Sequence, residues 1–227
     1  MPFKSKYLFN TYRPLAYTAL GRKRAVEYEL PPFIDGSCRR EPDFQMSSPA
    51  ISALCRSWAF APKLDVGHHI VYCAKKAAYK GKAAFWCLTA LLKVEARFDD
   101  HWEAAAWYME NEGHVPSNCM IDYNPPIKFE KTLGYYAKEE KEFKQNSRYL
   151  QPWDNSYKRR AETYPAMFAC KVIECALEAP IIVTPEMVSK QCPSRKLPNS
   201  YHNKFEITEA DWNWFQSLFR DGQRLDL

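Results

Sequence analysis

The sequence predicts a single α+β domain over residues 1–227, built on a curved mixed sheet or a small β-barrel with helices around it. The strongest observation is the stretch 84–98, whose first half is continuously apolar and whose second half alternates apolar with charged residues. This pattern is typical of a central strand that is buried at one end and half-exposed at the other. A helix-start signal follows directly at Asp99 and Asp100, and no stretch has the composition of a clean linker. Strands and helices are therefore expected to share one core.

Five further stretches favour strands because β-branched, aromatic and other apolar residues dominate them. In chain order they are 6–12, 24–30, 69–74, 167–175 and 181–183. A lysine-rich turn, 75–82, is expected to join the strand 69–74 to the long strand 84–98.

Helix starts are indicated by polar capping residues. Ser48 before Pro49 predicts a short helix, because proline is favoured at the first helical position. Asp100 with Glu103 predicts a capping box, and Gly113 is expected to end that helix. The predicted inner stripe of this helix consists of Trp102, Ala105, Ala106 and Met109.

Two segments lie outside a minimal sheet. Residues 128–160 are highly charged and only weakly amphipathic, which predicts a helical insertion. Residues 205–227 contain Thr208 and Asp211, which signal a last helix. We expect its apolar residues to dock on the core; they are Trp212, Phe215, Leu218 and Phe219.

Composition narrows the class of protein. The chain has no run of about 18 apolar residues, so no membrane span is expected. Eight cysteines without a secretory signal favour reduced thiols and a cytoplasmic location. No CxxC pair occurs and His68 directly precedes His69, so neither a metal site nor a cofactor is predicted.

The net charge of +5 is unevenly distributed along the chain. The first 24 residues contain six cations and no acid, and the stretch 63–82 holds five lysines against one acid. Acids gather instead in 99–112 and 206–211. Such asymmetry is typical of a surface that meets phosphate, although solvated strand and loop edges account for it equally well.

The charged loop, residues 34–44, has no apolar periodicity and is bounded by Pro31-Pro32 and Pro42. Its polar side chains are costly to bury unless they pair with one another or with a ligand. The candidate ligand-binding residues are Asp35, Ser37, Arg39, Arg40, Glu41 and Asp43. The alternative is a structural knot, in which the two arginines pair with Asp35, Glu41 and Asp43.

Three further residues complete the candidate site. Arg56 offers a planar fork for an anion, and Ser117 with Asn118 offers hydroxyl and amide groups that can read a base edge. Asn118 is alternatively a turn residue that bonds its own backbone. Some of Trp58, Trp86, Trp107 and Trp153 are expected either to stack on a base or to pack in the core.

The order of these elements resembles the PUA superfold, which includes the EVE, ASCH and YTH domains. The resemblance rests on Gly67 before Ile70-Val71-Tyr72, on 91–94, and on the helix from Asp100 with Ala105-Ala106-Trp107-Tyr108. The loop motifs at 35–43, Cys55-Arg56 and 116–119 resemble nucleotide-modification-associated proteins of phages and bacteria. This resemblance covers roughly residues 6–175 and implies a small barrel that holds RNA or modified bases. One departure is His68, which stands where PUA-like domains often have an acid.

Two functions follow as hypotheses. The first is a nucleic-acid-binding module that recognises a modified or flipped base of DNA or RNA in a pocket formed by 35–43, Arg56 and Asn118. The second is an enzyme of base modification in which Cys38 or Asp43 takes part in the chemistry. In this second hypothesis Arg39 and Arg40 would stabilise a Cys38 thiolate, and His101 or His114 would act as the general base. The simpler alternative is that the Cys38 thiol only packs against its neighbours.

Overall fold

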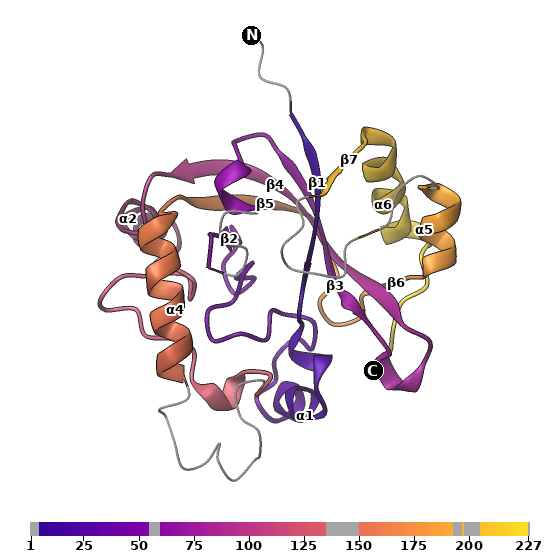
Figure 1. Ribbon diagram of the computed structural model, residues 1–227, viewed down its shortest axis with the longest axis horizontal. Coiled ribbons are helices and arrows are strands. Elements are labelled where there is room, and N and C mark those ends of the chain that lie inside the picture. Colours follow the sequence, from indigo (N-terminus) through magenta and orange to yellow (C-terminus); the bar gives the residue numbers. More distant parts are fainter. Residues whose placement is uncertain (1–4, 55–59, 135–149, 193–196, 198–204, 227) are drawn as a thin grey trace.

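The computed structural model describes residues 5–54, 60–134, 150–192, 197 and 205–226, and for 80, 150–153 and 205 the backbone only. In these residues seven strands and five α-helices form a mixed α+β fold, so the predicted class is confirmed (Figure 1). No helix in the described ranges has the length and apolarity needed to cross a membrane.

The seven strands form one mixed sheet in the order β2-β5-β4-β3-β1-β7, with β6 also paired to β4. Their bounds are β1 Tyr7–Tyr12, β2 Ala50–Ile51, β3 His69–Ala77, β4 Phe85–Phe98, β5 Met167–Cys175, β6 Ile181–Val183 and β7 Phe205–Ile207. β1 and β3 are parallel and the other pairs are antiparallel. No pairing joins the outer strands β2 and β7 across the described residues, so the sheet is open and the barrel alternative is not realised.

The long strand β4 organises the sheet, as its sequence predicts. β3 pairs along one edge, while β6 pairs with Trp86–Leu88 and β5 with the rest of the other edge. Because side chains alternate between faces, β4 contributes to two cores. Trp86, Leu88 and Leu91 pack on one face, whereas Leu92 and Val94 pack on the other.

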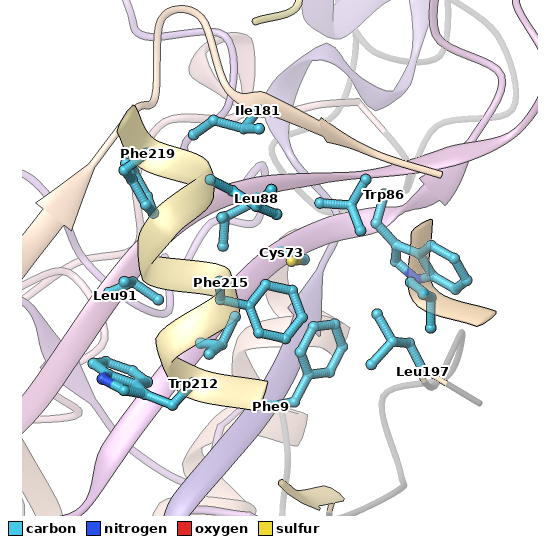
Figure 2. Close-up of a cluster of buried hydrophobic side chains, with 14 of the residues drawn as sticks. Phe9, Cys73, Trp86, Leu88, Leu91, Ile181, Leu197, Trp212, Phe215 and Phe219 are labelled. Carbon is cyan, nitrogen blue, oxygen red and sulfur yellow. The ribbon is translucent and has the colours of Figure 1, made fainter. Parts of the chain in front are cut away.

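The first of these cores lies beneath two C-terminal helices, α5 (Pro185–Gln191) and α6 (Glu209–Asp221) (Figure 1). Phe215 of α6 lies against Phe9 of β1, with ring centroids 5.7 Å apart, and belongs to the same cluster as Cys73 and Leu88 (Figure 2). The last helix signalled by Thr208 and Asp211 is α6, and these two residues form a capping box at its start.

The remaining helices are α1 (Ala19–Glu27), α2 (His101–Glu112) and α4 (Leu150–Thr163). Asp100 caps α2 and Gly113 ends it in the left-handed conformation, as predicted. The second half of the predicted capping box is displaced, because Glu103 accepts from the backbone N–H of Asp99. Of the expected insertion 128–160, residues 135–149 lie outside the described part, and α4 follows them.

Two predicted elements are wrong. Most of the stretch 24–30, expected as a strand, belongs to α1, which Thr18 caps by accepting from Gly21 N. The expected helix at Ser48 is absent because Ala50–Ile51 pairs with β5. The Glu112 carboxylate accepts from the N–H groups of Ser47 and Ser48, so these two residues are fixed by a distant side chain.

The predicted inner stripe of α2 is correct at Ala105 and wrong at Trp102, Ala106 and Met109. The side chains of His101, Ala104, Ala105 and Tyr108 are buried, whereas those of Trp102 and Met109 are 53% and 48% exposed. The two buried polar residues form hydrogen bonds with the backbone of other segments. Tyr108 donates to Ser48 O at 2.7 Å, and His101 accepts from Met120 N at 3.0 Å. Small alanines between them let the helix approach the sheet closely.

Candidate ligand site at the charged loop

The charged loop is an interior structure. Every residue from 34 to 43 is buried, and the backbone of the loop is held by three distant segments. Gly36 N donates to Arg13 O, Leu133 N donates to Gly36 O, and Ile127 N donates to Cys38 O. Glycine is required at 36, because a Cβ there would lie 2.5 Å from the side chain of Leu133.

Arg39 fastens this loop to α4 and to the segment 117–124. Its guanidinium forms a two-pronged ion pair with Asp154, with Nε–Oδ1 at 2.7 Å and Nη2–Oδ2 at 3.1 Å. Nη1 also donates to the carbonyls of Ser117 and Asn124 at 3.0 and 2.9 Å. The side chain is 3% exposed, so Arg39 acts as a structural clamp.

Arg40 is the largest fully buried side chain of the described residues. Nη1 donates to Gln45 Oε1 at 3.0 Å and Nη2 donates to Lys131 O at 3.1 Å. Burial lowers the pKa of the guanidinium, against the opposing influence of Asp43 and Asp35. Its Nε is buried without a hydrogen-bond partner.

The three acids of the loop bind N–H and hydroxyl groups. Asp35 accepts from Ser37 N at 2.8 Å, and Glu41 accepts from Ser52 Oγ at 2.5 Å. Asp43 accepts from Gln45 N at 3.1 Å and from Ser117 N at 2.7 Å. These bonds order the loop and attach it to the segment that contains Ser117.

The structure brings Ser117 and Asn118 to the charged loop, as the hypothesis of a shared site requires. Ser117 Oγ accepts from Arg40 N at 3.2 Å. Asn118 is fully buried and donates to Ala50 O at 3.1 Å, which makes it a tertiary contact rather than a local turn bond. Arg56 lies outside the described residues.

Cys38 is a packed thiol. It is fully buried and contacts a cluster that includes Leu54, Tyr157 and Ala161. Burial raises the pKa of the thiol to about 12, with Asp154 adding to the rise and Arg39 opposing it. The predicted effect of the neighbouring arginine therefore has the expected direction, but burial outweighs it and leaves the thiol protonated at neutral pH.

Some buried polar atoms at and near the charged loop have no hydrogen-bond partner among the described residues. Three of them are Arg40 Nε in the loop, Asn118 Oδ1 in the segment 117–124, and His101 Nε2, whose ring is bonded to Met120. Because His101 Nδ1 accepts from Met120 N, His101 Nε2 carries the proton. The three atoms therefore offer two donors and one acceptor. Buried groups of this kind are uncommon and call for a water or a ligand. The sequence indicates Arg40 and Asn118 as ligand-binding residues, whereas it indicates His101 only as a possible base for Cys38.

His101 makes the stability of the protein dependent on pH. Burial lowers its pKa from 6.5 to about 4, so the folded state disfavours the charged ring. Stability is thus complete above the unfolded pKa and falls as the pH drops from 6.5 to 4, by about 3 kcal/mol in total. Urea unfolding of wild type and His101→Gln at pH 7 and pH 4.5 measures this, and equal losses in both proteins would contradict it.

The remaining candidate residues from the sequence are four tryptophans and His114. Trp86 is buried in one core and Trp107 packs partly buried against another. Trp58 lies outside the described residues, and Trp153 is described by backbone only. His114 is exposed. A surface hollow of about 200 Å³ lies between Pro62, Arg97, Asp99, residues 163–166 and Phe168, and none of the candidate residues lines it.

A second feature is the basic end of the molecule, where η1 (Leu15–Tyr17), α1, η4 (Tyr79–Gly81) and η5 (Phe129–Lys131) meet. Ala16, Phe33 and Tyr79 share one apolar cluster, with the rings of Phe33 and Tyr79 5.4 Å apart. The cations of these segments are Arg13, Arg22, Lys23, Arg24, Lys75, Lys76, Lys82, Lys128 and Lys131, and their acids are Glu27, Glu29 and Glu130. Arg24 pairs with Glu27 at 2.9 Å, and Glu186 of α5 interacts electrostatically with Lys76.

Several of these cations lie over aromatic rings. Lys76 Nζ is 5.0 Å from the ring centre of Trp86, Arg13 lies over Tyr17 at 5.5 Å, and Lys131 lies over Tyr28 at 5.6 Å. Such contacts contribute about 0.5–1 kcal/mol each at exposed sites. The described residues of the basic end thus include more cations than acids.

No family model, curated protein or solved structure matches this chain.

Proposed function

We propose that the protein is a nucleic-acid-binding module whose basic end contacts the phosphate backbone. The observation that carries the proposal is the apolar cluster that Tyr79 shares with Phe33 and Ala16, because it joins the lysine-rich turn 75–82 to the end of the basic N-terminal region. Two cationic segments that are some 50 residues apart or more in sequence thereby form one surface. Phosphate contacts dominate nucleic-acid affinity, and they need such a surface.

The finer part of the proposal concerns the base. The PUA-like resemblance suggests a modified or flipped base, and Asn118 Oδ1 and Arg40 Nε are unpartnered atoms beside the charged loop. In this proposal Arg39, Ser117 and Asp43 hold the loop in place and do not contact the base, since their polar groups bind protein atoms. The enzyme alternative has weaker support, because burial keeps Cys38 protonated.

Binding is tested by fluorescence anisotropy with labelled 30-nucleotide single strands and duplexes of DNA and RNA at several salt concentrations. The double variants Arg22→Ala/Lys23→Ala and Lys75→Ala/Lys76→Ala should bind more weakly. In each variant the magnitude of the slope of log K against log salt should fall by about one for every phosphate that the variant no longer neutralises.

The matched control is Arg97→Ala/Lys171→Ala, which removes the same charge elsewhere. In the sheet, Lys171 of β5 lies opposite Lys93 of β4, and Lys93 lies opposite His69 of β3. His69 is at the end of β3 that is away from the basic turn. The control should leave the slope unchanged. Failure of the wild type to bind any oligonucleotide at 50 mM salt, or a slope that neither basic-end variant alters, would refute the proposal.

The same titrations test whether the protein recognises a modified base. Oligonucleotides with and without modified bases should be distinguished by the wild type, and Asn118→Ala should lose about 1–3 kcal/mol of that preference. An unchanged preference would remove Asn118 from base recognition while leaving the basic end in place.

A further inference from the structure

The outer face of α2 is an exposed apolar surface, which we call the α2 face: Trp102, Ala106, Met109 and the adjacent Tyr123. Trp102, Ala106 and Met109 are spaced four and three residues apart, so they lie on one side of the helix. Trp102, Met109 and Tyr123 are 53%, 48% and 62% exposed. The rings of Trp102 and Tyr123 meet edge to face, 5.9 Å between centroids.

This grouping is unusual for the molecule. Of the five large apolar residues that are exposed in the described ranges, three belong to the α2 face, and the other two are Val26 and Val66. Single exposed apolar residues are normal, whereas a contiguous group with two aromatic rings marks an interaction surface. Tryptophan and tyrosine are also the residues that contribute most binding energy at protein interfaces.

Acids surround the α2 face. Residues 99–127 contain six acids and no lysine or arginine, although the whole chain carries a net charge of +5. Asp99, Asp100, Glu103, Glu110 and Asp122 are exposed, and Glu112 is partly buried. An apolar centre with an acidic rim is complementary to a partner with an apolar centre and a basic rim.

We propose that the α2 face is a docking site for a cationic amphipathic helix of a partner protein, with apolar side chains on one side and Lys or Arg beside them. The acidic rim selects against the two other occupants. A symmetric dimer through this face would set the two acidic rims against each other. A nucleic acid would bring its phosphates to the same acids. The proposal is independent of nucleic-acid binding at the basic end.

The experiment uses two 18-residue labelled peptides: a helical peptide with leucine on one face and lysine on the other, and its counterpart with glutamate in place of lysine. The full chain should bind the lysine peptide at least ten times more tightly than the glutamate peptide, with the affinity falling as salt rises. Trp102→Ala should weaken binding of the lysine peptide at least tenfold, and Glu110→Gln/Asp122→Asn about threefold.

Val26→Ala is the matched control, since it removes an apolar side chain that is 82% exposed on α1. It should leave the affinity for the lysine peptide unchanged. Circular dichroism checks that each variant is folded, and Met109→Ala replaces Trp102→Ala if the latter is not.

Equal binding of both peptides, or an affinity that the α2-face variant does not alter, would overturn the proposal. Sedimentation velocity gives the other decisive result. Self-association of the wild type that Trp102→Ala abolishes would assign the α2 face to a second copy and would also overturn the proposal.

Discussion

Arg39→Ala is expected to lower the free energy of unfolding by about 3–5 kcal/mol, which is the usual cost of breaking a buried ion pair by removing one partner. The substitution takes away the guanidinium that binds Asp154 and the carbonyls of Ser117 and Asn124. The Asp154 side chain is 26% exposed, so water can solvate part of its carboxylate after the substitution. The two carbonyls, however, lose a buried hydrogen-bond donor. Arg39→Lys should also be destabilising, because an ammonium cannot replace the planar fork.

Urea unfolding followed by circular dichroism measures this effect. The matched control is Arg97→Ala, whose carboxylate partner Asp99 lies 3.8 Å away in a pair with side chains 50% and 89% exposed. An exposed pair of this kind contributes about 0–1 kcal/mol, so the two arginines should differ clearly. Equal costs for Arg39→Ala and Arg97→Ala would contradict the role of Arg39 as a structural clamp.

Phe215→Ala should cost about 3–5 kcal/mol, as is typical when a buried aromatic ring is removed and a cavity remains. Phe215 is fully buried between α6 and the sheet, where it lies against Phe9 (Figure 2). The same apolar cluster contains Trp86, over whose ring Lys76 lies. The substitution therefore tests whether α6 is part of the core that supports one side of the basic end.

Chemical denaturation of Phe215→Ala, Phe215→Leu and Asn213→Ala gives the answer. Phe215→Leu should cost less than Phe215→Ala, because most of the volume is kept. Asn213 is exposed on the same helix, and Asn213→Ala should change stability by about 0.5 kcal/mol or less. A cost below about 1 kcal/mol for Phe215→Ala would mean that α6 adds little to the fold.

Local signals in the sequence were sufficient for the longest strands and for the starts of α2 and α6. The strand predicted at 84–98 is β4, and the one predicted at 167–175 is β5. The capping roles of Asp100 and Thr208 are also predicted correctly, because a cap binds N–H groups only two or three residues further along the chain.

Tertiary contacts decided the elements that sequence patterns did not predict. Ala50–Ile51 became a strand because β5 offers an antiparallel partner, and the Glu112 carboxylate satisfied the N–H groups before it. The rotation of α2 depends on partners for His101 and Tyr108 that lie elsewhere in the chain. An apolar pattern alone therefore placed Trp102 and Met109 on the wrong face.

The charged loop shows the same division most clearly. Its composition shows that its polar side chains need hydrogen-bond or ion-pair partners if they are buried. Two arrangements could supply them: a structural knot within the protein or a bound ligand. Only the folded chain supplies those partners, since Arg39 binds Asp154, which is 115 residues away, and Ser117, which is 78 residues away. A side chain's demand for hydrogen bonds is set by its chemistry, whereas the donors and acceptors that meet this demand are set by chain topology.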